Sequence, residues 1–215
     1  GDMLLHGGIH NSALQPDGSY NYAHVFEHTK DRIASADIAV ANQEVILGGV
    51  ELGVSSYPTF NSPQAFGDAL VDTGFDVILH ASNHTMDKDT IGVLNTIHFW
   101  KENHPDTTFL GINESEEERD TIKIVEKDGI KIAMLNYTYG LNGFSLPADK
   151  PYLVNLMDEA HKSEIAEDMK KAREQADFVI VYPHWGTEYV LEATDEQKQW
   201  AQFFADNGAD LIIGT

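Results

Sequence analysis

Cysteine is absent from this sequence of 215 residues, which excludes disulfide bonds, thiolate nucleophiles and zinc sites built on cysteine. There is also no apolar run of about 18 residues, the length that a helix needs to cross a bilayer. No secretory signal peptide is visible at the amino end. A chain without cysteine fits both the cytosol and the surface of many Gram-positive bacteria, so these absences leave the compartment open.

Basic residues are scarce, with 14 lysines and arginines against 35 aspartates and glutamates and a formal net charge of −21. Such a chain repels phosphate backbones, and we therefore exclude a general nucleic-acid binder. The acid-rich surface favours solubility. A long polyanionic ligand would need a local basic patch, and the sequence does not indicate one.

A single domain over residues 1–215 is predicted, because 42% of the residues are hydrophobic and no linker divides the chain. One unit recurs along it: an amphipathic helix, an apolar run rich in strand formers, and then polar residues. The first predicted helix, 24–35, precedes a strand at 37–41, and the third, 162–176, precedes a strand at 177–182. The second helix is capped by Ser62, has Pro63 in its first turn, ends at Gly74 and precedes a strand at 75–79. The fourth runs from a Thr194–Gln197 capping box to Gly208 and precedes a strand at 210–213.

The remaining segments complete an α/β pattern. A strand is predicted at 131–136 after the Asp128-Gly129 turn, a helix at 89–103, a loop at 140–156, and a solvated turn or loop at the acidic run 114–120. Apolar strands that alternate with helices predict a layered fold with a largely parallel or mixed sheet covered by helices on both faces. The chain begins where an apolar strand should be ending and stops just after 210–213, so we expect the domain to be incomplete at both ends.

Polar side chains follow the predicted strands. They are Asp2, Glu44, Asn83, His84 and His184, with Asp2 following a strand that would precede Gly1. In parallel α/β sheets, ligands bind beyond the carboxyl ends of the strands. Any one of these residues is explained equally well by a turn, a helix cap or a packed histidine. Together their oxygen and nitrogen atoms indicate a metal-dependent hydrolase-like site for Mn²⁺, Zn²⁺, Fe or Mg²⁺.

Three further residues are candidates for supporting roles. Asp87 and Glu188 are placed either to orient a ligating histidine by accepting its second N–H or to cap a helix. His80 is a candidate partner behind the ligands. The other histidines lie outside the pattern, and we expect most of them on the surface or on helices.

Several of these stretches match a known family. They are Gly1-Asp-Met-Leu-Leu-His6, Ala39-Val-Ala-Asn-Gln-Glu44, Phe75-Asp-Val-Ile-Leu-His-Ala-Ser-Asn-His-Thr-Met-Asp87, His184-Trp-Gly-Thr-Glu188 and Gly208-Ala-Asp-Leu-Ile-Ile-Gly214. In order and spacing the chain resembles the CapA family of poly-γ-glutamate capsule biosynthesis proteins, whose domain is similar to calcineurin-like metallophosphatases. The resemblance covers nearly the whole chain.

The resemblance implies a role for each candidate residue. Asp2 matches the first metal-binding aspartate, Glu44 the bridging carboxylate, Asn83 the metal-binding asparagine, His84 the substrate-facing histidine and His184 the later metal-binding histidine. The chain departs from the pattern at Leu4, where a histidine is usual, and it stops at Thr215, where a His-x-His ligand pair is expected. The divalent metal ion implied by the resemblance therefore has an incomplete ligand set here, consistent with one weakly held ion or none.

Two functions follow from the resemblance and stay open. In one, the metal activates water and His84 assists the leaving group, with a phosphoester as substrate or the amide of poly-γ-glutamate as an alternative. In the other, the protein is a non-catalytic component that binds, exports or anchors a polyanionic polymer. The family's setting implies an extracellular or cell-surface protein, anchored through a segment outside this sequence, with membrane-bound capsule synthesis partners.

Overall fold

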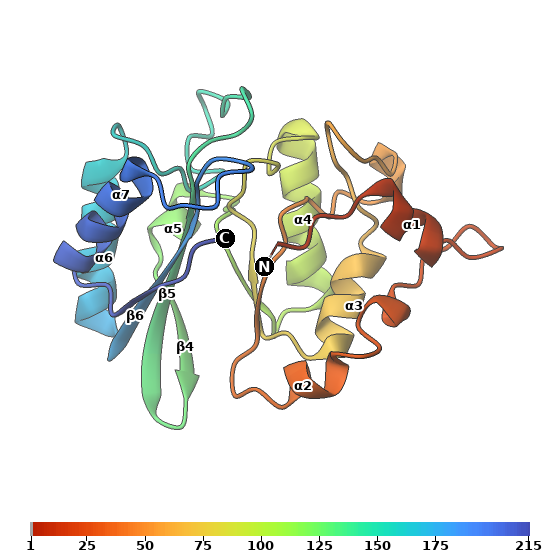
Figure 1. Cartoon of the computed structure of the whole chain (residues 1–215), viewed down its shortest axis with the longest axis horizontal. Coiled ribbons are helices and arrows are strands. Elements are labelled where there is room, and N and C mark those ends of the chain that lie inside the picture. Colours follow the sequence, from red (N-terminus) through yellow and green to blue (C-terminus); the bar gives the residue numbers. More distant parts are fainter. Residues whose placement is uncertain (1) are drawn as a thin grey trace.

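Two sheets form the centre of the computed structural model, which describes residues 2–215 (Figure 1). The first sheet is parallel, in the order β1 (Val40–Asn42), β2 (Val77–Leu79) and β3 (Thr108–Leu110). The second has the order β4 (Lys123–Lys127), β5 (Ile130–Thr138), β6 (Phe178–His184) and β7 (Leu211–Ile212). Only the β4–β5 hairpin in it is antiparallel.

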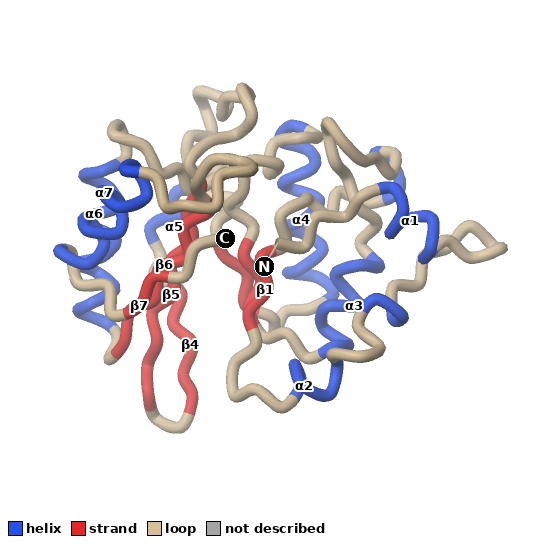
Figure 2. Tube along the Cα trace, in the orientation of Figure 1, coloured by secondary structure: helices blue, strands red, loops and turns tan. Residues whose placement is uncertain are grey.

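The two sheets pack face to face. Val77 and Leu79 of β2 meet Met134 of β5 and Ile180 and Tyr182 of β6 in a shared buried cluster. Helices cover the two outer faces, with α3 and α4 on one side of the molecule and α6 and α7 on the other (Figures 1 and 2). The prediction of an α/β fold with parallel and mixed sheets is confirmed. The two faces of one sheet are not both covered by helices, however, because one face of each sheet is occupied by the other sheet.

The helices follow from local sequence signals to different degrees. They are α1 (Gly7–Ala13), α2 (Lys30–Ala34), α3 (Ala65–Thr73), α4 (Asp89–Asn103), α5 (Glu116–Asp120), α6 (Lys162–Gln175) and α7 (Asp195–Asp206), with 3-10 turns η1 (Ala23–Val25) and η2 (Val50–Leu52). The bounds of α4 agree with the prediction, and both hydrogen bonds of the Thr194–Gln197 capping box are present. Gly74 ends α3 with a left-handed φ of 102°.

Three predicted segments differ from the structure. The helix expected over 24–35 is split into η1 and α2, because the chain turns through residues 26–29 to bury Phe26. The helix expected to be capped by Ser62 begins only at Ala65, and its cap residue Gln64 makes no side-chain capping bond. Strand β6 continues through His184, so this histidine is the last residue of its strand and does not follow it.

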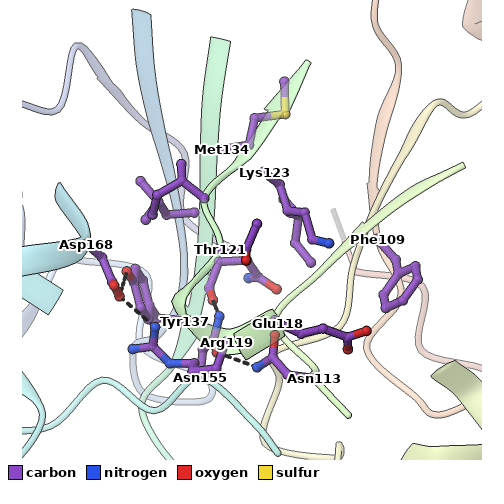
Figure 3. A pocket seen from close by; sticks show the side chains of 15 residues that line it. Phe109, Asn113, Glu118, Arg119, Thr121, Lys123, Met134, Tyr137, Asn155 and Asp168 are labelled. Carbon is purple, nitrogen blue, oxygen red and sulfur yellow. Dashed lines mark hydrogen bonds and ion pairs between the residues drawn. The ribbon is translucent and has the colours of Figure 1, made fainter. Parts of the chain in front are cut away.

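The acidic run 114–120 is also not the solvated loop that we predicted. Ser115 caps a short helix, α5, by accepting a hydrogen bond from the amide of Glu118 at 3.2 Å. The buried Arg119 guanidinium of this helix forms ion pairs with Asp168 at 2.9 Å and Glu164 at 2.5 Å on α6. Figure 3 shows Arg119 and Asp168 of this network beside a cavity of about 30 Å³, which is large enough for a water molecule.

Candidate functional site

The carboxyl ends of β1, β2 and β6 meet at one edge of the two sheets and bring the predicted site residues together. At β1, the side-chain amide of Asn42 donates to Asp2 Oδ1 at 2.7 Å, and the amide of Met3 donates to the Asn42 carbonyl at 2.8 Å. Asp2 is thereby held beside the end of β1, as an isolated parallel bridge to Asn42 also shows. The N and C labels near the centre of Figure 1 mark this edge.

Glu44 is a buried carboxylic acid, with only 7% of its surface exposed. Burial raises its pKa to about 7, and the charge of Asp2 adds to this effect by repulsion. A carboxylate that is buried beside another carboxylate is unfavourable unless a cation or a proton compensates it. The site is therefore short of positive charge.

Asn83 and His184 face each other across the two sheets. His184 Nε2 lies 3.0 Å from Asn83 Oδ1 and 4.0 Å from Glu44 Oε1. The other ring nitrogen, Nδ1, lies 3.1 Å from the hydroxyl of Thr215. Burial lowers the pKa of His184, while the charge of Asp2 acts in the opposite direction. The ring therefore tends towards the neutral form, in which one nitrogen has a free lone pair.

His84 forms a pair with Asp87. Its Nδ1 lies 2.7 Å from Asp87 Oδ2, which also accepts the backbone N–H of Phe60 at 2.6 Å. The Phe60 ring packs edge-on against the imidazole, with ring centres 4.7 Å apart. Since the carboxylate holds the proton on Nδ1, Nε2 is the nitrogen left for another partner.

The two other residues proposed for supporting roles, His80 and Glu188, lie in different surroundings from Asp87. His80 is buried behind the site, where its Nε2 accepts the indole N–H of Trp100 at 2.7 Å. Its partner in this bond is therefore none of the five candidate residues, and burial lowers the pKa of His80 to about 3. Glu188 lies on an exposed loop after β6, and its charge contributes to the raised pKa of Glu44. The ring nitrogens of His184 face Thr215 and Asn83, so Glu188 does not orient that histidine in this structure.

A buried asparagine, Asn136 on β5, joins the two halves of the site. Its Oδ1 accepts the backbone amides of His80 at 3.1 Å and Ala81 at 2.8 Å, and its Nδ2 donates to the Tyr182 carbonyl at 2.9 Å. One side chain thus fixes the end of β2 relative to β5 and β6. Gly111, with a φ of +91°, passes so close that a Cβ there would lie 2.3 Å from Asn136 Oδ1.

Sequence reasoning missed two residues that border the site, Tyr139 and Asn142. The Tyr139 ring stacks on His184 with ring centres 6.2 Å apart, and Asn142 Oδ1 accepts from Asn83 Nδ2 at 3.1 Å. The latter bond turns Asn83 Oδ1 towards His184. Both residues closely follow strand β5, so the strand-end rule that indicated the other residues would have found them.

The donor atoms at this edge match what a divalent ion needs. Within residues 2–215, no three His, Asp or Glu side chains gather closely enough to form a metal cluster by themselves. The arrangement here differs because an amide oxygen, Asn83 Oδ1, takes part. Its 3.0 Å distance from His184 Nε2 is that of a hydrogen bond, and the same two atoms are neighbouring donors that a bound ion would share. The buried carboxylate of Glu44 supplies compensating negative charge. The types of donor therefore suit a divalent ion, and Asp2, Glu44 and His184 would have to draw closer together to hold one.

Solved structures with the same arrangement of elements define the class of fold. A putative 5'-nucleotidase from Staphylococcus aureus, solved in complex with alpha-ketoglutarate, covers 100% of this chain with a TM-score of 0.56 and 16% identity, over 43% of its own chain. A hypothetical protein from Thermus thermophilus covers 89% of this chain and 61% of its own, with a TM-score of 0.50 and 16% identity. The chain thus has a metallophosphatase-like α/β fold.

The family follows from the sequence comparison. The family described as "Bacterial capsule synthesis protein PGA_cap" matches residues 1–215, and the chain belongs to it. The PGA biosynthesis protein CapA of Bacillus subtilis (strain 168) is 32% identical over 146 residues, which are 67% of this chain and 37% of that protein. The capsule biosynthesis protein CapA of Bacillus anthracis is 28% identical over 147 residues, 68% of this chain and 35% of that protein.

The resemblance to the CapA family is therefore confirmed. This chain spans little more than a third of the length of those two relatives. Among residues 2–215, no helix has the length and apolar character required to cross a membrane.

Proposed function

We propose that the edge formed by β1, β2 and β6 is a metal-dependent hydrolytic site that acts on a phosphoester during capsule biosynthesis at the cell surface. The observation that carries the proposal is the buried Glu44 beside Asp2, opposite two uncharged donor atoms 3.0 Å apart on Asn83 and His184. A divalent cation would relieve the repulsion between the carboxylates. Membership of a capsule synthesis family and the metallophosphatase-like fold support the proposal.

Asp2, Glu44, Asn83 and His184 would hold the ion. A bound divalent ion lowers the pKa of a coordinated water and neutralises charge on a phosphoryl group. The surrounding residues of the chain keep the ligands in place. Asn42 holds Asp2, Asn142 turns the Asn83 oxygen inward, and the Thr215 hydroxyl contacts the far nitrogen of His184.

His84 would act on the leaving group. In the doubly protonated ring, Asp87 accepts the Nδ1 proton and the proton on Nε2 can be donated to the oxygen that departs. The Phe60 ring and backbone amide limit rotation of both partners. General acid catalysis of this kind contributes a factor of about 10²–10⁴ in rate.

The first experiment measures bound metal and phosphoesterase activity with added Mn²⁺, for the unchanged protein and His84→Ala. With Mn²⁺ added until the weakly held site is saturated, we expect bound metal in both and a loss of at least about 100-fold in kcat for the variant. His28→Ala, which removes an exposed histidine that is not among the site residues, is the matched control and should keep full activity. Absence of bound metal in the unchanged protein would show that the proposed ligand set is wrong.

A non-catalytic polymer-binding or anchoring component is the second candidate, favoured by the capsule biosynthesis role for which the relatives are named. In that case metal binds, no phosphoester is cleaved, and His84→Ala leaves polymer binding unchanged. Membrane-bound synthesis partners would then supply the chemistry. Measuring poly-γ-glutamate binding by both proteins separates this candidate from the hydrolase.

A further inference from the structure

A groove begins where the candidate site ends, and Tyr139 is the boundary between them. One face of Tyr139 stacks on His184, and the same residue lines a groove of about 400 Å³ together with Trp200 and the first turns of α6 and α7. A narrower pocket extends the groove to Trp185, the residue after His184. Tyr139 is 43% exposed, so its ring is accessible to a molecule in the groove.

The groove is aromatic and carries excess negative charge. Asp158, Glu159 and Glu196 line it. Asp158 is paired with His161 at 2.7 Å and Glu159 with Lys162, so Glu196 carries the charge that is not compensated within the described residues. Lys162 Nζ lies 2.8 Å from Glu159 and 5.4 Å from the centre of the Trp200 ring. An ammonium group therefore already rests in this groove between a carboxylate and an aromatic face, the two surroundings that stabilise alkylammonium ions.

Glu196 provides a second place for such a group. It stands in the first turn of α7, is exposed, and makes no ion pair within the described residues 2–215. Tyr139 lines the same groove and offers an aromatic surface. A polyanion would be repelled here by Glu196 and by the net charge of −21.

We infer that the groove binds an alkylammonium group on the leaving part of the substrate, whose phosphoester lies at the candidate site. The substrate class is then an aminoalkyl phosphoester, with its anionic end at Glu44, Asn83 and His184 and its cationic end beside Glu196. This inference rests on the proposed function for the phosphoester end only. The ammonium site is defined by the groove itself.

Binding is tested first without catalysis, using 1,5-diaminopentane as the probe in the presence of EDTA. Fluorescence titration is suitable because two of the three tryptophans, Trp185 and Trp200, line the groove or its extension, whereas Trp100 is fully buried. We expect saturable binding of the diamine and none of uncharged 1,5-pentanediol. Glu196→Gln should weaken diamine binding about threefold, the effect of losing one exposed ion pair. Glu192→Gln removes the same charge from an exposed loop position outside the groove and should leave binding unchanged.

Turnover then connects the groove to the site. With Mn²⁺, kcat/KM for 5-aminopentyl phosphate should exceed that for pentyl phosphate, and Glu196→Gln should remove the difference. Diamine binding without any turnover would overturn the proposed hydrolase and leave the ammonium site standing. Equal binding of diamine and diol, equal loss in Glu196→Gln and Glu192→Gln, or tighter binding of poly-γ-glutamate in the groove would overturn the ammonium site, whatever the activity.

Discussion

Individual residues in this protein are constrained most strongly where the two sheets meet. The buried asparagine at position 136 bonds to backbone groups at the ends of β2 and β6, and Gly111 gives it the space to do so. Neither role is visible in the sequence, because both depend on atoms that are far apart in the chain. The strand-end residues were easier to predict, since their positions follow from the direction of the strands alone.

Gly111→Ala should destabilise the protein by about 2–4 kcal/mol, because the new methyl would meet the Asn136 oxygen and, at 2.4 Å, the Ala81 amide nitrogen. Gly18→Ala is the matched control. Gly18 has a similar φ of +87° but nothing within 4 Å of the added methyl, so only the backbone cost of about 1 kcal/mol applies. Urea denaturation measures both. Equal losses would show that the close contact has no energetic weight.

At the scale of elements, α6 and α7 were predicted correctly from the sequence and α5 was not. The Thr194–Gln197 capping box and the spacing of Ile165, Met169 and Ala172 predicted α7 and α6, because these signals lie within one helix. Helix α5 was missed although Ser115 and Glu118 have the spacing of a capping box, because the acidic run was interpreted as a solvated loop. The ion pairs of Arg119 with α6 could not be predicted, since their partners lie far along the chain. The acidic run looks solvated in the sequence, yet its one arginine is buried.

Arg119→Ala should destabilise the fold by about 3–5 kcal/mol, since Asp168 would remain buried without its cation. The hydroxyl of Tyr137, which donates to Asp168 at 2.9 Å, compensates only part of that loss. Arg173→Ala removes a comparable pair with Asp210 at the surface and should cost less than about 1 kcal/mol. Thermal unfolding of the two variants compares them, and a similar small loss in both would contradict a structural role for the Arg119 network.

At the scale of the whole molecule, stability should depend on pH through a neutral buried histidine. Folding lowers the pKa of His80 from 6.5 to about 3 because the ring is fully buried. Between those values the unfolded chain binds the extra proton at His80, so this group lowers the free energy of unfolding as the pH drops below 6.5. The slope from His80 alone reaches about 1.4 kcal/mol per pH unit. Glu44, whose pKa rises from 4.5 to about 7 on folding, contributes a slope of the opposite sign between those values.

His80→Gln should remove the His80 contribution while keeping an acceptor for the Trp100 indole, so the variant should lose less stability than the unchanged protein as the pH falls. Urea denaturation between about pH 7.5 and 4.5, a range that begins above the unfolded pKa, gives the two slopes. His28→Ala, which removes an exposed histidine, should leave the slope unchanged. If His80→Gln retained the slope of the unchanged protein, the acid sensitivity would come from other groups.

The Asn136 bonds also determine how the molecule can open. The amide of Ala81 donates to Asn136 on β5, so its hydrogen–deuterium exchange reports separation of the sheets. The amide of His80 also donates to the Leu110 carbonyl on β3 at 2.9 Å and stays bonded within its own sheet. Asn83 and His84 follow β2 of one sheet, and His184 ends β6 of the other. Any excursion that exchanges the Ala81 amide must therefore also pull the site apart, and a ligand that spans the site should slow that exchange.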